Sequence, residues 1–335
     1  MLGMVTLRDI ALRAGVSTAT VSNVLNSTLY VSPKLRERVL TAVRELKYQP
    51  NAVARSLRMR QSRTIGMIIP DIANPFFPAV VRGAEDVLMH SGYTLIVGNS
   101  DNDQAKEEAY YRAFFERQVD GLLAVATTGQ PPDGLKRLND RNTPIVFVDR
   151  YYLGIPGDVV IANNQAGARK AVAHFAERGH KRIAIITGPL DLVNARARLD
   201  GYRQELQSRG LEVNKELIRE GAFDTASGVE QTAALLALKP RPDAIFVCNA
   251  LMVCGALQCL EKEKVKCPKD VAVACFDRLD FFDLLRPQLT CVDAPSYELG
   301  ATGAELVLKR ITGKLTGPWQ RRVLPTPLVE RESSG

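Results

Sequence analysis

Up to residue 48, apolar residues recur every three or four positions, which is the period of an α-helix. This spacing predicts three short helices, whose apolar faces are formed by Leu7, Ile10 and Ala14, by Val21, Val24 and Leu25, and by Val39, Val43 and Leu46. Thr6 and Ser17 can cap the first two helices, and Ser32-Pro33 is a typical start for the third. The turn Ala14-Gly15-Val16 between the first two predicts a helix-turn-helix.

Beyond Pro50 the helical spacing returns only briefly. Residues 51–58 predict one more short helix, and residues 59–64 are polar and basic, as in a linker. A helix of about eight residues is marginal in isolation because nucleation is costly. We therefore expect the order of this segment to depend on what it contacts.

From residue 65 onward, short apolar runs alternate with longer amphipathic stretches. The runs predict strands at 65–69, 94–97, 122–126, 145–148, 183–186, 244–247 and 271–275, and the stretches predict helices at 77–90, 105–117, 165–178, 196–209, 227–238 and 252–261. Such alternation predicts an α/β fold of doubly wound parallel sheets with helices on both faces. Because about 270 residues exceed one core, we expect two lobes that divide near 158–163, with crossings near Pro295 and beyond.

Charge is distributed unevenly along the chain. The net charge is +7, yet residues 1–63 contain eleven Lys or Arg against Asp9, Glu37 and Glu45, a net of +8, so the remaining residues sum to −1. A basic module attached to a neutral body is typical of a phosphate-binding head on a domain that does not bind nucleic acid. A solvated basic face would give the same charge bias, so the bias supports a phosphate-binding head without establishing it.

Several classes of protein receive little support. The six cysteines contain no C-x-x-C pair and lie far from the three histidines, so we expect buried reduced thiols, no metal and no cofactor. No apolar run is long enough to span a membrane and no signal peptide is recognisable, which favours a cytoplasmic protein. The nucleotide-binding, metalloprotease and hydrolase motifs are absent, so we expect no enzyme.

Several segments resemble one known family over essentially the whole chain. The segment VTLRDIALRAGVSTATVSNVLN is similar to the helix-turn-helix of the lactose/galactose repressor family, and KYQPNAVARSLR is similar to its hinge. TIGMIIPDIANPFF, ERGHKRIAIITGP and LVERESSG resemble parts of its regulatory domain, which has the architecture of periplasmic sugar-binding proteins. The resemblance implies a helix-turn-helix domain at 1–49, a hinge helix and linker at 50–63, and an effector-binding and dimerisation domain at 64–335.

The resemblance also implies which residues contact DNA. Reading positions at the start of the second helix match Thr18, Ala19 and Asn23, which can contact base edges in the major groove. Phosphate contacts are expected from Arg8 and Arg55, with Lys34 and Arg36 as further candidates, although each could be a solvated surface charge. In the family's hinge a leucine enters the minor groove, and Leu57 matches it beside Arg58; the alternative is a leucine packed on the head. A homodimer on a palindromic operator is the expected assembly.

Ligands of open parallel sheets bind beyond the carboxyl ends of the strands. Residues that follow predicted strands there are Asn74, Phe77, Ser100, Asp101, Asp149, Arg150, Asn249 and Asp277. The resemblance implies effector contacts for Asn249 and Asp277, for Arg198 three residues before Gly201, and for Phe223. Plainer interpretations remain open: Phe77 as core, Arg198 as a surface arginine, and Asp277 as a cap of the following turn.

Two departures from the family bear on the effector. The family often has Asn-Asp where this chain has Asn249-Ala250, and an acidic residue where it has Ala162-Asn163. Because Arg150 and Arg198 remain, we hypothesise a sugar acid such as a gluconate or ketogluconate rather than a neutral sugar. Ligand is expected to release DNA. An enzyme on the same architecture, a transport-linked binding protein and a nucleoid-type architectural protein are the alternatives.

Overall fold

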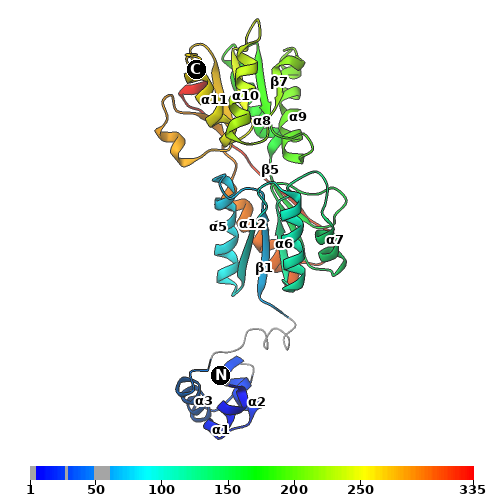
Figure 1. The fold of residues 1–335 in the computed structure, drawn as a ribbon, viewed down its shortest axis with the longest axis vertical. Coiled ribbons are helices and arrows are strands. Elements are labelled where there is room, and N and C mark those ends of the chain that lie inside the picture. Colours follow the sequence, from blue (N-terminus) through cyan, green and yellow to red (C-terminus); the bar gives the residue numbers. More distant parts are fainter. Residues whose placement is uncertain (1–4, 27–28, 49–60) are drawn as a thin grey trace. The chain divides into compact units, whose positions relative to one another are not determined.

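The computed structural model describes residues 5–26, 29–48 and 61–335. The chain forms two compact units, Met1–Ser62 and Arg63–Gly335, each of which is treated by itself (Figure 1). The hinge helix expected at 51–58 lies outside the described residues, as do Arg55, Leu57 and Arg58. Within the described ranges, no helix is long and apolar enough to cross a membrane.

The described part of the first unit contains the helices α1 (Leu7–Ala14), α2 (Thr18–Asn26) and α3 (Pro33–Glu45). Helix α1 begins with a capping box, in which the backbone N–H of Thr6 donates to the Asp9 carboxylate at 2.8 Å and that of Asp9 donates to Thr6 Oγ1 at 3.4 Å. It ends at Gly15, whose φ of 62° favours glycine. Ile10, Val21 and Val39 are fully buried and join the helices around one small core. The predicted helix-turn-helix is present.

Helix α3 holds the turn between α1 and α2 in place. Arg38 Nη2 donates to the carbonyl oxygens of Ala14 at 2.6 Å and Gly15 at 3.3 Å. These carbonyls lie at the C-terminal end of α1, where acceptors lack partners within the helix and a positive charge is favourable. The guanidinium therefore fixes the turn that sets the direction of α2.

The second unit consists of two lobes, each built on a six-stranded sheet. The first lobe has the strand order β11–β5–β4–β3–β1–β2, with β1 (Thr64–Ile69), β2 (Thr94–Asn99), β3 (Gly121–Ala124), β4 (Ile145–Val148), β5 (Asp158–Ala162) and β11 (Arg321–Leu324). The second has the order β12–β10–β9–β8–β6–β7, with β6 (Ile183–Thr187), β7 (Ile218–Glu220), β8 (Ala244–Val247), β9 (Ala272–Phe276), β10 (Thr290–Val292) and β12 (Leu328–Val329). Every pairing is parallel except that of β10 with β12.

Helices cover both faces of the first sheet because successive strand residues point to opposite sides. Ile65, Met67 and Ile69 of β1 pack in the cluster that includes residues of α5 (Phe76–His90) and α12 (Ser296–Ile311), whereas Ile68 packs with α6 (Gln104–Glu116) and α7 (Asp133–Asp140). Helices α5 and α12 touch backbone to backbone: a Cβ added at Gly300 would lie 1.8 Å from the carbonyl oxygen of Val80. Only glycine permits this approach.

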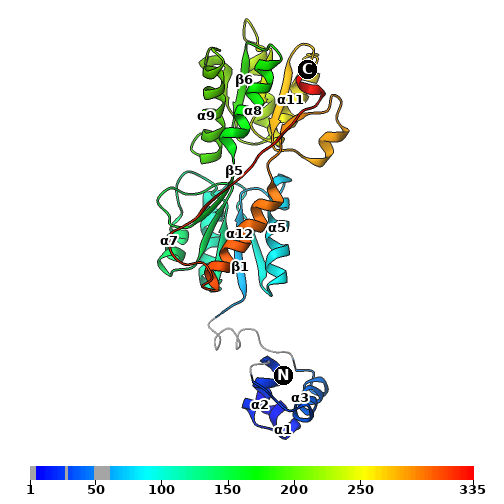
Figure 2. The ribbon, with the colours of Figure 1, turned by 180° about the vertical axis from the view of Figure 1, so that it is seen from behind.

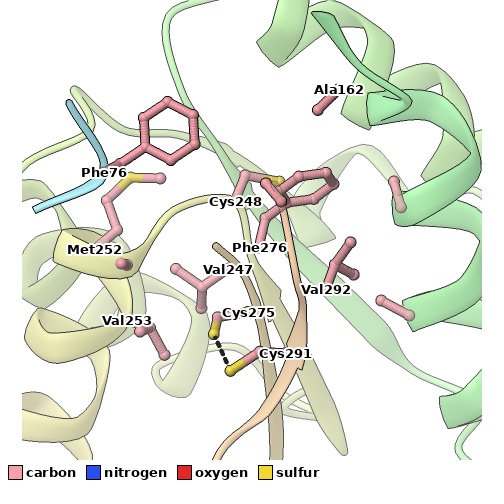
Figure 3. Packing of buried hydrophobic residues seen from close by; sticks show 14 of the residues in the cluster. Phe76, Ala162, Val247, Cys248, Met252, Val253, Cys275, Phe276, Cys291 and Val292 are labelled. Carbon is pink, nitrogen blue, oxygen red and sulfur yellow. Dashed lines mark hydrogen bonds between the residues drawn. The ribbon is translucent and has the colours of Figure 1, made fainter. Parts of the chain in front are cut away.

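The second sheet is flanked by the helix pairs α8 (Asn164–Glu177) with α9 (Val193–Ser208) and α10 (Thr225–Leu236) with α11 (Ala250–Lys262). Its central strands are continuous apolar runs, as expected for strands covered on both faces. Figure 3 shows Val247, Cys275 and Cys291 of neighbouring strands packed in this core. The Sγ atoms of Cys275 and Cys291 lie 3.0 Å apart, and burial raises the pKa of the Cys275 thiol.

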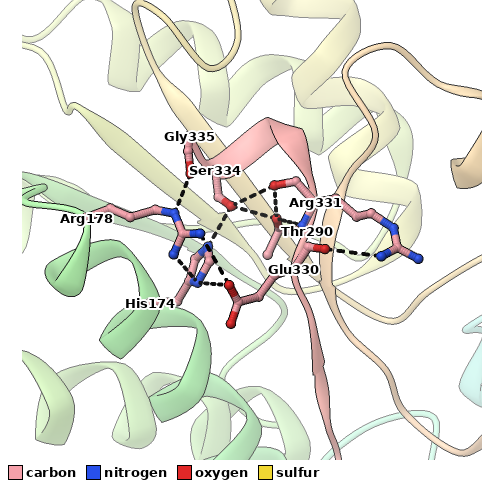
Figure 4. Close-up of polar contacts among 7 residues, drawn as sticks. All are labelled: His174, Arg178, Thr290, Glu330, Arg331, Ser334 and Gly335. Carbon is pink, nitrogen blue, oxygen red and sulfur yellow. Dashed lines mark hydrogen bonds and ion pairs between the residues drawn. The ribbon is translucent and has the colours of Figure 1, made fainter.

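The chain passes between the lobes at three places. Strand β5 of the first lobe leads into α8 of the second, β10 leads back to α12, and β11 leads again to β12 (Figure 2). The last residues of the chain form hydrogen bonds and ion pairs with the second lobe, as Figure 4 shows. Ser334 Oγ lies 2.6 Å from both His174 Nε2 and Thr290 Oγ1. These contacts anchor the far end of the third crossing.

The structure differs from the predicted elements chiefly at short strands and helix starts. Strands β5, β7, β10, β11 and β12 and helices α7 and α12 were not predicted. Strands β7, β10 and β12 have only two or three residues, and β11 is a largely exposed strand that begins with two arginines, so neither gives an apolar run. Helix α9 begins at Val193 rather than at Arg196, because Leu192 in an extended conformation precedes it. The expectation of buried thiols holds for Cys248, Cys259, Cys275 and Cys291 but is wrong for Cys254 and Cys267, which are partly exposed.

Candidate DNA-binding surface and ligand site

The predicted DNA-reading residues lie on one helix of the first unit. Thr18 and Ala19 are exposed in the first turn of α2, and Asn23 is partly exposed one turn later. Val21 and Val24 point into the core, so the opposite face of α2 is left at the surface. Arg8 is exposed on α1. A short helix that presents small and polar side chains suits insertion into a major groove.

The seven predicted effector-binding residues of the second unit surround one small cavity, which we call the ligand site. It is lined by Asn74, Phe76, Phe77, Asp149, Arg150, Asn194, Arg198, Phe223, Asn249 and Asp277. Its volume is about 10 Å³, roughly the space of one water molecule. Ser100 and Asp101, which also follow a strand, do not line it: Ser100 bonds to Thr127, and Asp101 pairs with Lys106.

Arg150 occupies the middle of the ligand site. Its guanidinium carbon lies 5.6 Å from the ring centre of Phe77 in the first lobe and 5.1 Å from that of Phe223 in the second. The side chain is buried, and its Nε and Nη1 have no hydrogen-bond partner among the described residues. Burial lowers the pKa of Arg150, and Asp149 opposes that shift. Buried donors left unpaired are costly, which marks these two as donors suited to a ligand.

Two buried carboxylates face the two arginines. Asp149 Oδ2 lies 3.5 Å from Arg150 Nε and accepts a hydrogen bond from Asn194 Nδ2 at 3.2 Å, and Asp277 Oδ1 lies 3.8 Å from Arg198 Nη2. Burial raises the pKa of Asp149 and that of Asp277, the latter to about 6, although the arginines counteract it. The Oδ1 atom of each has no hydrogen-bond partner within the described ranges. The site therefore offers free acceptors as well as free donors.

Arg198 is fixed from several sides. Its Nε donates to Asn164 Oδ1 at 2.8 Å, its Nη1 donates to the carbonyl oxygen of Cys248, and its guanidinium carbon lies 3.7 Å from the ring centre of Phe276. The side chain is 2% exposed, so the interpretation as a surface arginine is wrong. A guanidinium held by two bonds and a stacked ring is preorganised for planar recognition.

The backbone is unusual at three residues of the site. Asp149, Phe223 and Asp277 have φ values of 62°, 63° and 69°, in the left-handed region that non-glycine residues seldom adopt. Such conformations persist only where the surroundings impose them, and they cluster at functional sites. The Phe223 turn is held by Asn249, whose Nδ2 donates to the Phe223 carbonyl at 2.8 Å while its Oδ1 caps α11.

The ring of Phe223 lies over Gly188. A Cβ added at Gly188 would be 2.1 Å from that ring, so any larger residue would displace it. On the other wall, Asn74 Oδ1 accepts a hydrogen bond from the backbone of Phe76 at 3.1 Å, and the rings of Phe76 and Phe77 meet edge to face. Phe77 thus belongs to the core and to the site at once.

The sequence did not single out Phe76 or Asn194 as site residues. Asn194 lies in the first turn of α9, which was predicted to begin later, and the start of a helix after a strand was the signal that could have found it. A wider cavity of about 670 Å³ adjoins the ligand site and shares Asp149 and Asn194 with it. Residues of both lobes line it, among them Tyr151, Asn163, Arg196 and Arg321.

Comparison with known proteins identifies the family. Residues 6–51 match the model of bacterial regulatory proteins of the lacI family, and residues 172–334 match a periplasmic binding protein-like domain. The chain is 38% identical to the ribose operon repressor of Halalkalibacterium halodurans, over 99% of this chain and 97% of that protein. The chain belongs to the lacI family. It is a DNA-binding transcriptional regulator with a helix-turn-helix and a periplasmic-binding-protein-like domain, as the sequence resemblance implied.

Other lacI-family proteins match over similar lengths. The HTH-type transcriptional repressor PurR of Photobacterium profundum is 36% identical, with 93% of each chain covered. Among solved structures, a complex of the transcriptional regulator CelR with cellobiose has a TM-score of 0.76 at 33% identity, covering 98% of this chain and 99% of that one. The lac repressor dimer bound to operator and the anti-inducer ONPF has a TM-score of 0.86 at 28% identity, covering 99% of both.

Proposed function

We propose that this lacI-family protein is a transcriptional repressor that binds a palindromic operator as a homodimer and releases it when a small neutral sugar enters the ligand site. D-ribose is the first candidate, because relatives at 38% and 35% identity over nearly the whole chain are ribose operon repressors. A cytoplasmic location belongs to this proposal. The assignment of residues 1–49 to DNA binding, 50–63 to a hinge and 64–335 to effector binding and dimerisation is likewise part of it.

The observation that carries the choice of ligand is the set of unpaired polar atoms. Asp149 Oδ1 and Asp277 Oδ1 can accept hydrogen bonds, and Arg150 Nε and Nη1 can donate them. A sugar hydroxyl both donates and accepts, so neighbouring hydroxyls can pair with both kinds of atom. Phe77 and Phe223 supply apolar faces for the C–H surfaces of a ring.

The sugar-acid hypothesis receives less support than a neutral sugar. It rested on two acidic residues that the family often has and that this chain lacks at Ala250 and Ala162-Asn163, but two other carboxylates lie close to the arginines: Asp149 lies 3.5 Å from Arg150, and Asp277 lies 3.8 Å from Arg198. With two carboxylates against two guanidiniums, the site has little positive charge left for a ligand carboxylate. Gluconate and ketogluconate remain ligands to be tested beside the neutral sugars.

On DNA, we propose that Thr18, Ala19 and Asn23 contact base edges and that Arg8 and Arg55 contact phosphates. Leu57 and Arg58 would enter the minor groove from the hinge, as in the family resemblance. One helix-turn-helix reads only a few base pairs, so two related by a two-fold axis match a palindrome. Ligand binding changes the relation of the two lobes within each subunit, and a coupling of about 1–3 kcal/mol would alter operator affinity roughly 5- to 150-fold.

Calorimetric titration of D-ribose, D-glucose, gluconate and 2-ketogluconate tests the ligand. D-ribose should bind most tightly, Asp149→Asn and Asp277→Asn should each weaken it, and Asp101→Asn should not, because Asp101 follows a strand outside the site. Tighter binding of either sugar acid than of both neutral sugars would refute the choice of a neutral ligand. Binding of none of them would refute the sugar as effector.

A further inference from the structure

Glu107 is a buried carboxylate outside the ligand site. It lies on α6 with no solvent exposure. Tyr152 Oη lies 2.8 Å from both of its oxygens and donates to them, and Tyr111 Oη donates to Oε1 at 3.1 Å. No Lys, Arg or His pairs with it in the described part of the chain, and only Tyr152, Tyr111 and Thr127 form hydrogen bonds to its carboxylate. Because burying an unpaired carboxylate is costly, its place in the core calls for an explanation.

The hydrogen bonds of Glu107 lead to the ends of three strands of the first lobe. Tyr152 Oη also accepts the backbone N–H of Thr127, at 3.1 Å, and Thr127 Oγ1 lies 2.9 Å from Ser100 Oγ. Ser100 Oγ in turn donates to the carbonyl oxygen of Ile69 at 3.3 Å. The network thus joins the carboxyl ends of β1, β2 and β3 to the turn after β4.

That turn carries Asp149 and Arg150 into the ligand site, and its backbone is strained. Asp149 has a φ of 62°, and the N–H of Arg150 bonds back to the carbonyl of Val148 at 2.7 Å. Beyond these two, Tyr152 is 2% exposed and its ring meets that of Phe147 edge to face. The Tyr152 hydroxyl is therefore the side-chain anchor that ties the strained turn to α6.

We propose that Glu107 is a positioning residue of the ligand site, which acts through Tyr152 on the turn that holds Asp149 and Arg150, so that the charge of Glu107 sets the affinity for the sugar. The identity of the ligand rests on the proposed function. The role of Glu107 in holding the turn does not.

Glu107 titrates within the pH range in which sugar binding can be measured. Burial raises its pKa to about 7, although hydrogen bonds from Tyr152, Tyr111 and Thr127 oppose the rise. The titratable groups that face it are Tyr111 on its own helix and Tyr152 on the turn, and burial raises the pKa of both, so they stay neutral. An ionised Glu107 accepts both hydroxyls, whereas a protonated one must donate its own proton and loses the charge-assisted bond to Tyr152.

Two tyrosine variants separate positioning from general stability. Tyr152→Phe and Tyr111→Phe each remove one hydroxyl from Glu107, but only Tyr152 belongs to the turn. Titration with D-ribose should show binding weakened by about 2- to 30-fold in Tyr152→Phe, the range seen for residues that act without touching the ligand. At pH 8.5, where Glu107 is largely ionised, Tyr111→Phe should bind as the wild type does. Equal weakening in both variants, or none in Tyr152→Phe, would overturn the proposal.

The pH profile supplies the second readout. Wild-type affinity for D-ribose should rise from pH 6 to 8.5. Asp277 titrates in the wild type and in Glu107→Gln alike, so only the part of the rise that Glu107→Gln abolishes reports the ionisation of Glu107. An identical profile in Glu107→Gln would contradict the role of charge.

A third readout needs no sugar. Hydrogen exchange of residues 146–153 in the ligand-free protein should be faster in Tyr152→Phe than in Tyr111→Phe. If no sugar binds to the wild type, the proposed function fails, while this comparison still decides the role of Glu107; equal exchange in the two variants would refute it.

Discussion

Asp277→Asn should stabilise the ligand-free protein although it weakens sugar binding. The carboxyl is 6% exposed, and burial raises its pKa from the ordinary value of 3.8 to about 6 despite Arg198 and Arg150. The folded chain therefore holds this proton more tightly than the unfolded chain does. As pH rises from about 4 to 6, the wild type loses stability by ionising a group that folding prefers neutral.

The size of the effect follows from the two pKa values. Ionising Asp277 costs the fold about 1.6 kcal/mol at pH 5 and about 3 kcal/mol at pH 7.5, and the cost is constant above that. Asparagine has the same shape and no charge, so the variant avoids this cost; the pKa of about 6 already includes the attraction of Arg198 for the carboxylate, so the ion pair needs no separate allowance. The stability difference between variant and wild type should thus shift by about 1.4 kcal/mol in favour of the variant between pH 5 and 7.5.

Thermal unfolding followed by circular dichroism at pH 5 and 7.5 measures this shift. For a unit of this size it corresponds to roughly 3–6 °C in the Tm difference. Asp101→Asn is the control, because a hydrogen bond from Lys106 lowers the pKa of Asp101 and no gain with pH is expected. A difference for Asp277→Asn that stays constant or shrinks between the two pH values would refute the buried-charge argument.

Three other substitutions test separate parts of the account. Gly188→Ala places a Cβ 2.1 Å from the Phe223 ring and should weaken D-ribose binding in calorimetry; unchanged affinity would show that the ring position does not matter. Arg38→Ala removes the hydrogen bonds to the carbonyls of Ala14 and Gly15 and should weaken operator binding in fluorescence anisotropy, whereas Arg44→Ala on the same helix should not. Equal operator affinity of the two variants would count against a role for the Arg38 hydrogen bonds in holding the turn. Leu57→Ala should weaken operator binding about tenfold or more with sugar binding intact, and an unaltered operator affinity would eliminate the minor-groove wedge.

Much of the fold could be predicted because its signals are local. Strands β4 and β8 are continuous apolar runs between polar segments, and their predicted bounds agree with the structure. Strands β10 and β12 pair with partners that are distant in sequence and have three and two residues. Their existence depends on tertiary packing rather than on a period in the sequence.

The residues of the ligand site could likewise be predicted only in part. The rule that ligands bind at strand ends located Asn74, Arg150, Asn249 and Asp277, and the family resemblance added Arg198 and Phe223. The stacking of Arg150 between Phe77 and Phe223 could not be predicted, because it joins residues of two lobes. Glu107 gave no signal either: a glutamate in the first turn of a helix is ordinarily a solvated residue, and only the fold brings Tyr152 to it.

The central claim is that a sugar in the ligand site controls the affinity of the helix-turn-helix for DNA. Fluorescence anisotropy at near-cellular salt, with a palindromic duplex selected from random sequence and a scrambled duplex, measures it directly. The account predicts a preference for the palindrome of about 10³-fold or more, and a 5- to 150-fold loss of affinity with saturating D-ribose that Arg150→Met abolishes. Equal binding of both duplexes, or operator affinity indifferent to every sugar that calorimetry shows to bind, would contradict it.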